Sequence, residues 1–158
     1  MCGWPDSVKT LAHAPIKVAG ALIGIRPVAG RSKVEPPLLE IFIPRLPPRE
    51  FSPNSRAHHL ARHTAGIVAC DEVIAGVLAA GYDAGVLDAP LVDIQWGVPD
   101  KRRRDWDNLI AACKPFVDGL VKAGVLRDDS IRDYQPRYSW FDSPRKPRTE
   151  IRVYRGWV

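Results

Sequence analysis

Residues 91–108 of this 158-residue chain read LVDIQWGVPDKRRRDWDN, and the predicted secondary structure builds outward from them. The first eight of these residues alternate apolar and polar side chains, which is the pattern of a half-buried β-strand. Pro99 and Asp100 end this strand. Four consecutive cations follow, and behind them Asp105 and Asp107 stand two positions apart at the predicted start of a helix. Cations and clustered carboxylates therefore meet where a strand passes into a helix.

Two elements are predicted before this segment. Residues 38–43, LLEIFI, have the composition of a strand. A proline-rich loop separates this strand from a helix of about twenty residues, in which apolar side chains recur at helical spacing. The helix is expected to begin near Ser55 or Leu60, to reach Ala80 and to stop at Gly81.

Three elements are predicted after it. A helix covers about 107–123 and closes at Gly124, because glycine commonly ends helices. Two strands follow, at about 131–140 and at 149–154, joined by a turn over 142–147 with a basic tip. The order β-α-β-α-β-β predicts an α+β fold, a single domain in which two helices pack on one mixed sheet.

Pro115 lies inside the second predicted helix and leaves two alternatives. An interior proline removes a backbone hydrogen bond and clashes with the preceding turn, at a cost of about 3 kcal/mol. Either the helix kinks there, or Lys114 and Pro115 begin the main helix and residues 108–113 form a separate turn or short helix. The helix is expected to pack on the sheet through its apolar side and to present Asp107, Lys114 and Asp118 outward.

Residues 1–36 are predicted to be an N-terminal extension without an assigned role, and residues 37–158 form the main domain. The apolar part of the extension, 16–30, is interpreted as a peripheral strand or loop rather than a secretion signal. No apolar run approaches the roughly 20 residues that span a bilayer. The chain has three cysteines without paired spacing. We therefore expect Cys70 and Cys113 to be buried thiols and the protein to be cytoplasmic.

The charge is distributed unevenly along the chain. Residues 1–98 contain 9 Lys and Arg against 9 Asp and Glu, whereas residues 99–158 contain 14 against 9. The whole net charge of +5 therefore belongs to the C-terminal part, where the carboxylate clusters also lie. A basic field around an acidic centre indicates a polyanionic substrate held near a metal, and a merely solubilising surface is the alternative.

The side-chain types at this centre indicate a particular chemistry. Clustered carboxylates suit a hard divalent cation and basic side chains suit phosphate, the two requirements of metal-assisted cleavage of a nucleic-acid backbone. The alternative interpretation is that Asp107 or Asn108 merely caps the helix. A second acidic pair, Asp128 and Asp129, follows the helix and could be only a solvated turn. Three histidines lack partners at metal-ligand spacing and are expected to be exposed or to contact phosphate: His58, His59 and His63.

Four motifs, in their order along the chain, resemble the RusA family of Holliday-junction resolvases of bacteria and their prophages. They are DWDNL at 105–109, KPFVDGL at 114–120, KAGV at 122–125 and DD at 128–129. The basic segment PDKRRR that precedes them is similar to that family as well. The close resemblance covers roughly residues 96–134, and the order of elements extends it loosely to 38–155.

This resemblance implies a structure-selective DNA endonuclease that resolves four-way junctions in recombination and repair. It implies that Asp105, Asp107 and Asp129 bind the catalytic Mg²⁺, for which Mn²⁺ is a substitute, and that Lys114 is the lysine of the catalytic site. Asp129 rather than Asp128 is assigned from its distance to the glycine that ends the helix.

One departure from the family pattern concerns the helix. The spacing from Asn108 to Lys114 is about three residues longer than in the best-known members, slightly less than one helical turn. The spacing from Lys114 to Asp129 matches the family.

A larger group of cations is expected to grip the DNA backbone. They are Lys101, Arg102, Arg103 and Arg104, with Arg145 and Lys146 at the hairpin tip. A four-way junction has two-fold symmetry and needs two opposed nicks, so the resemblance implies a homodimer with one site in each subunit. Two alternatives stay open: a branched-DNA-binding protein without catalysis, and a degenerate prophage product that folds but no longer cuts.

Overall fold

The computed structural model describes residues 35–156, so the predicted extension, residues 1–36, lies outside the described residues except for its last two. Eight elements follow one another along the described chain. They are β1 (Leu39–Ile43), the 3-10 helix η1 (Arg49–Phe51), α1 (His59–Ala79), β2 (Leu91–Val98), α2 (Trp106–Ala112), α3 (Lys114–Lys122), β3 (Gln135–Asp142) and β4 (Arg148–Tyr154).

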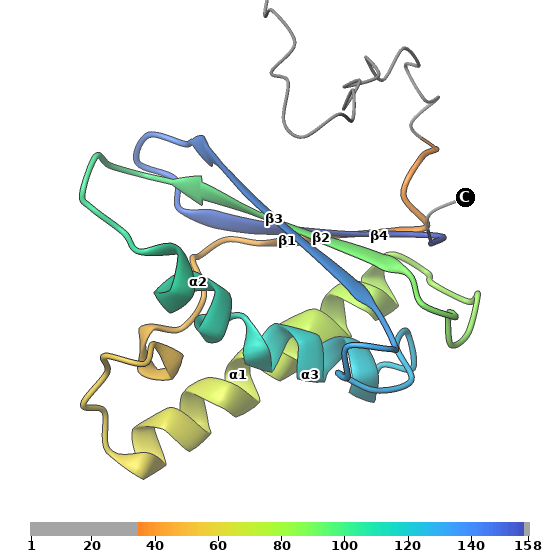
Figure 1. Ribbon diagram of the computed structural model, residues 1–158, viewed down its shortest axis with the longest axis horizontal. Helices are drawn as coiled ribbons and strands as arrows, with labels where there is room; N and C mark the ends of the chain where they lie inside the picture. Colours follow the sequence, from red (N-terminus) through yellow and green to blue (C-terminus); the bar gives the residue numbers. More distant parts are fainter. Residues whose placement is uncertain (1–34, 157–158) are drawn as a thin grey trace, which may run out of the picture. The chain divides into compact units, whose positions relative to one another are not determined.

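The four strands form one mixed sheet in the order β1-β4-β2-β3. β4 pairs antiparallel with both β1 and β2, whereas β2 and β3 run parallel. Parallel neighbours need a long crossover connection, and α2 and α3 supply it. All three α-helices lie against the same face of the sheet (Figure 1). The predicted α+β architecture, with a mixed sheet and helices packed on it, is confirmed.

The core lies between this face of the sheet and the helices. In β1 the burial alternates strictly, with Leu39, Ile41 and Ile43 buried and the residues between them exposed. Such alternation is what a strand with one covered face must show. From the central strand β2, Ile94 and Trp96 enter the same core, where the helices contribute mainly Val73 of α1 and Phe116 and Leu120 of α3.

The helix α1 begins one residue before the later of the two predicted starts. His58 is its N-cap, and its ring Nδ1 accepts a hydrogen bond of 3.3 Å from the backbone N–H of Leu60. All three histidines of this segment are exposed, as expected. The chain leaves the helix at Gly81, whose φ of 64° is the left-handed conformation that glycine adopts without strain.

The predicted continuous helix over 107–123 is wrong, and the alternative in which the main helix begins at Lys114 and Pro115 is confirmed. α2 ends at Ala112 with Cys113 as its C-cap, and Pro115 lies in the first turn of α3, where its missing N–H leaves no bond unmade. The backbone carbonyl of Cys113 accepts the first bonds of α3, from Phe116 N at 2.9 Å and Val117 N at 3.2 Å. The side chains of Cys70 and Cys113 are both buried thiols, as predicted.

The third strand begins later than predicted. Residues 131–134 form a turn, in which the Asp133 N–H donates to the Ser130 carbonyl at 3.0 Å and the Ser130 hydroxyl donates to the Asp133 carboxylate. Ile131, the apolar residue that suggested a strand, is 93% exposed. β3 therefore starts at Gln135 and continues to Asp142. Within the described residues, no helix has both the length and the apolar character needed to cross a membrane.

Candidate functional site

The candidate site lies where β2 and β3 end together. The two strands are parallel and in register, with Val98 opposite Asp142, so the segments that follow them leave the sheet at the same edge. The N–H of Ser143 donates to the carbonyl of Val98 at 2.8 Å, and the N–H of Arg145 donates to the carbonyl of Pro99 at 3.4 Å. These two bonds hold the β3–β4 hairpin tip beside the start of the basic segment.

The hairpin tip carries Arg145 and Lys146, both predicted to contact DNA. Arg145 is exposed and adopts a positive φ of 64°. The Ser143 hydroxyl donates to the carbonyl of Lys146 at 2.7 Å, and this closes the turn. Two groups of cations that are separate in the sequence, the tip and residues 101–104, thus lie at one edge of the fold.

The basic segment 101–104 is organised around Asp100. The carboxylate of Asp100 accepts from the backbone N–H of Arg102 at 3.0 Å and pairs with the Arg104 guanidinium at 2.9 Å. These contacts lower the pKa of Asp100 from its ordinary value, and the hydrogen bond from Arg104 has the largest effect. Arg104 is mostly covered, whereas the side chains of Arg102 and Arg103 are 87% and 92% exposed. The segment therefore presents two arginines outward from a folded loop.

Asp105 and Asp107 are both exposed at the start of α2. Asp105 is the N-cap residue and has an extended backbone, with φ −91° and ψ 138°. Its side chain makes no capping bond to the helix among the residues described and instead pairs with Arg103 Nε at 3.4 Å. The interpretation that Asp107 or Asn108 caps this helix is wrong, because both lie inside it.

Asn108 ties the start of α2 to the loop after β1. Its Oδ1 accepts hydrogen bonds from the Ser52 hydroxyl at 3.0 Å and from Asn54 Nδ2 at 3.2 Å. Its Nδ2 donates to Asp105 Oδ2 at 3.5 Å. This role of Asn108 was not predicted from the sequence. The motif containing Asn108 and the polar residues of the proline-rich loop were visible, but their contact spans more than fifty positions and has no local signature.

A second ionic cluster lies at the start of α3. The ammonium group of Lys114 pairs with the carboxylates of both Asp118 and Asp129. Partial burial acts to lower the pKa of Lys114, but the two carboxylates outweigh it and the net pKa is raised. The hydrogen bond from Lys114 lowers the pKa of Asp129. Asp128 faces its own turn instead, since its Oδ1 accepts from the N–H of Asp129 at 2.8 Å.

The structure thus joins some of the predicted site residues. Lys114 and Asp129 are in direct contact, while Asp105 and Asp107 lie one short helix earlier, beside the basic segment. Within residues 35–156, no three His, Cys, Asp or Glu side chains are grouped so that they could hold a metal ion. The three-carboxylate metal site stays a prediction, and the pairing of Lys114 with Asp129 is a finding.

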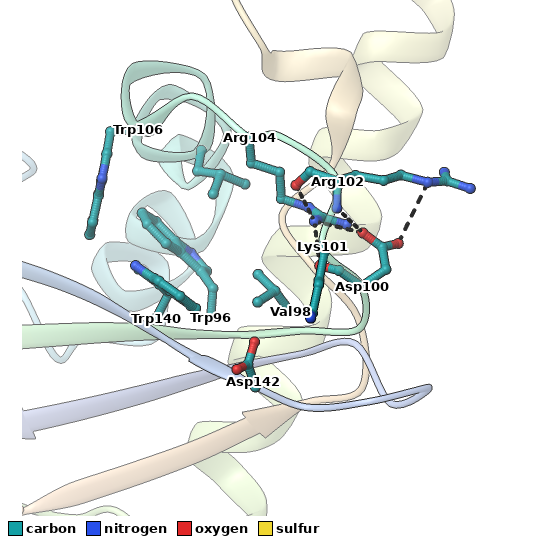
Figure 2. Close-up of a pocket in the computed structure, with 10 residues that line it drawn as sticks. Trp96, Val98, Asp100, Lys101, Arg102, Arg104, Trp106, Trp140 and Asp142 are labelled. Atoms are coloured by element: carbon teal, nitrogen blue, oxygen red, sulfur yellow. Dashed lines mark hydrogen bonds and ion pairs between the residues drawn. The ribbon is translucent and has the colours of Figure 1, made fainter. Parts of the chain in front are cut away.

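A cavity of about 500 Å³ opens between the ends of β2 and β3, the basic segment and α2. Figure 2 shows its indole rings gathered at one end and the basic side chains at the other. It is lined by Trp96, Val98, Asp100, Lys101, Arg102, Arg104, Trp106, Leu109, Trp140 and Asp142. This cavity was not predicted from the sequence. Its signal was the pair Trp96 and Trp140, which become direct neighbours only once β2 and β3 are known to be parallel and in register.

Comparison with known proteins assigns the chain to no family. No protein-family model matches the chain, and no curated protein matches it significantly.

Proposed function

We propose that this chain is a Mg²⁺-dependent DNA endonuclease of the RusA type that resolves four-way junctions. The observation that carries the proposal is the pair of backbone hydrogen bonds from the hairpin tip to Val98 and Pro99. Through them, the cations of the tip lie beside the start of the basic segment 101–104, which leads directly into α2, where Asp105 and Asp107 are exposed. A cationic surface around paired carboxylates suits a phosphodiester backbone and the metal that would assist its cleavage.

The donor set at the start of α2 fits Mg²⁺. This ion takes oxygen ligands and is commonly held by one or two carboxylates together with substrate phosphate and water. Asp105 and Asp107 would hold it, and the extended backbone at Asp105 is the geometry in which carboxylates two positions apart can converge. When bound, the ion would polarise the scissile phosphate and make a bound water more acidic.

Charge stabilisation and phosphate binding would be the roles of basic residues of the chain. The ordinary lysine pKa of 10.5 lies well above neutral pH, and the two carboxylates raise the pKa of Lys114 further, so Lys114 stays protonated and acts as a fixed cation rather than a base. Such a cation stabilises the negative charge that accumulates on phosphorus oxygens in the transition state. Asp129 holds this ammonium group in position. Arg102 and Arg103, being almost fully exposed, would contact backbone phosphates.

A cleavage assay tests this function directly. A synthetic four-way junction and a linear duplex of the same sequence are incubated with the full chain, with Mg²⁺, with Mn²⁺ or with EDTA. We expect paired nicks in the junction only when metal is present, and little cutting of the duplex. The variant Asp107→Asn should bind the junction as well as the wild type and leave it uncut. Equal cleavage by variant and wild type would remove Asp107 from the site.

A branched-DNA-binding protein without catalysis is the second candidate. It is favoured by the ion pair that engages Asp129, together with the lack of a three-ligand group in the described part of the chain. Under this alternative the junction is bound with the same salt dependence, and added metal produces no nicks.

The endonuclease proposal further includes a homodimer, so that two sites meet the two strands to be cut, and a location in the bacterial or phage-infected cytoplasm.

A further inference from the structure

We propose that the cavity between the ends of β2 and β3, here called the tryptophan pocket, binds one unpaired nucleotide of the DNA substrate. In this arrangement the base stacks on Trp106 and Trp140 while its phosphate meets Lys101 and Arg102. The inference rests on the proposed function only in taking DNA as the substrate, because it requires no cleavage.

The aromatic end of the pocket is built for stacking. Trp106 and Trp140 come from α2 and β3, and they are 49% and 54% exposed although indole is among the side chains that gain most from burial. Both line the same cavity, and the fully buried Trp96 lies beside them. The Trp96 ring is 5.6 Å from the Trp106 ring and stacks on Tyr138 at an interplanar angle of 15°. Trp96 is therefore held in place by packing, beside the two accessible rings of Trp106 and Trp140.

Away from the indole rings, the pocket is lined by three cations and by the carboxylates of Asp100 and Asp142, so its net charge is positive. Arg104 is fixed by its ion pair with Asp100 and by hydrogen bonds to the carbonyls of Asp100 and Arg102. Lys101 and Arg102 line the same cavity and are exposed. A ligand that satisfies both ends must combine a flat aromatic group with an anion, and a nucleotide has both. The cavity volume of about 500 Å³ lies within the usual range of sites for small organic ligands.

The nucleotide must be unpaired to use this pocket. In a duplex both faces of a base are covered by its neighbours, so stacking on indole requires that the base leave the helix. Opening costs least where stacking is already interrupted, as at a branch point. Arg104 and Trp106, the residues on either side of Asp105, both line the pocket, so a captured base would keep its phosphate close to the proposed site.

The test measures binding in EDTA, so that cleavage plays no part. The probes are a fluorescently labelled single-stranded oligonucleotide of six nucleotides and free deoxyadenosine monophosphate, each titrated with the full chain. The variants are Trp106→Ala, Trp140→Ala and Trp140→Phe. Phe42→Ala is the matched control, because Phe42 is an exposed aromatic residue on β1, the edge strand farthest from β3. Thermal melts check that each variant folds.

We expect each alanine variant to bind the oligonucleotide about 10-fold more weakly, the loss typical of one base–aromatic stack. Trp140→Phe should retain most of the affinity, and Phe42→Ala should stay within about two-fold of the wild type. Unchanged binding by both alanine variants would overturn the pocket even if the chain cuts junctions. Tighter binding of the mononucleotide than of the oligonucleotide would also overturn it, by assigning the pocket to a free nucleotide. If the tryptophan variants bind the oligonucleotide more weakly but the wild type cuts no junction, only the endonuclease proposal fails.

Discussion

The ammonium group of Lys114 pairs with the carboxylate of Asp129, joining the first residue of α3 to the turn that precedes β3. Asp118, one helical turn along α3, shares the same ammonium group. Lys114 therefore has two carboxylate partners of different origin, one inside its own helix and one from a distant segment. This difference allows the role of each partner to be measured separately.

Asp129→Asn is expected to abolish junction cleavage while leaving junction binding intact. The substitution releases Lys114 from its position and removes the third carboxylate of the metal site predicted from the sequence, and losing one such electrostatic contribution typically costs about 100-fold or more in rate. The ion pair is partly exposed to solvent, so its loss should lower the free energy of unfolding by no more than about 1 kcal/mol. Cleavage rate and chemical denaturation of the same preparation give both values.

Asp118→Asn is the matched control for this experiment. It removes the other carboxylate from the same ammonium group but lies outside the proposed metal-binding set. We expect cleavage within a few-fold of the wild type, because Asp129 still holds Lys114. Similar losses in both variants would mean that Asp129 acts only by neutralising Lys114 and is no ligand.

The same ion pair predicts how stability depends on pH. The pKa of Asp129 is lowered by Lys114, so its stabilising effect is present above the ordinary carboxyl pKa of 3.8 and disappears as the pH falls through the lowered value. The pKa of Lys114 is raised, so the effect also persists up to the ordinary lysine value of 10.5 and is lost above it.

Melting temperatures of the wild type and Asp129→Asn across the acid range check this prediction. The wild type should be the more stable protein near neutral pH. The difference should shrink as the pH falls below the ordinary carboxyl pKa of 3.8 and vanish below the lowered pKa of Asp129, where this carboxyl group is protonated in both states. A difference that stays constant down to pH 2 would show that the ion pair contributes nothing through titration of Asp129.

Neutralising Arg102 and Arg103 together should weaken junction binding and flatten its salt dependence. Each lost phosphate contact reduces the slope of log affinity against log salt by about 1. Their side chains are almost fully exposed, so the melting temperature should hardly change. Arg132→Ala is the control, because Arg132 is exposed in the turn before β3, at the other end of the strand from the basic segment. An unchanged slope in the double variant would remove the basic segment from the DNA interface.

Local patterns in the sequence were enough for much of this fold. The alternation over residues 91–98 predicted β2 with both of its ends, and the chemistry of proline offered the break at Pro115 as one of two outcomes. Periodicity could not choose between those outcomes, because the apolar residues of α2 and α3 continue in phase across the break. The predicted start of β3 at Ile131 was wrong, since one apolar residue beside a polar turn is as compatible with a strand as with an exposed loop.

The candidate site was predictable only in part, because its parts meet through long-range contacts. The acidic and basic residues around Asp105 could be singled out by their local density alone. The contact of Asn108 with Ser52 and Asn54, and the neighbourhood of Trp96 and Trp140, depend on how loops and strands pair. Sequence spacing carries little information on such pairing until the order of strands in the sheet is known.

Gly119 lies where α3 packs tightly against α1, and Gly119→Ala is expected to destabilise the fold. An added Cβ would lie 2.7 Å from Val73 Cβ and 3.0 Å from the Cys70 carbonyl oxygen, both in the packed face of α1. Alanine favours an isolated helix over glycine by up to about 1 kcal/mol, but overpacking of a core commonly costs about 1–3 kcal/mol.

The clash should therefore win, and urea denaturation should show a net loss of stability for Gly119→Ala. Lys122→Ala is the control, because it also introduces alanine into α3 but at an exposed position, where the change should stay within about 0.5 kcal/mol. A shift of α3 away from α1 would also displace Lys114 at its first residue, so we expect Gly119→Ala to slow cleavage more than it weakens junction binding. A variant as stable as the wild type would mean that α1 and α3 can separate without cost, and that their close packing does not fix the position of Lys114.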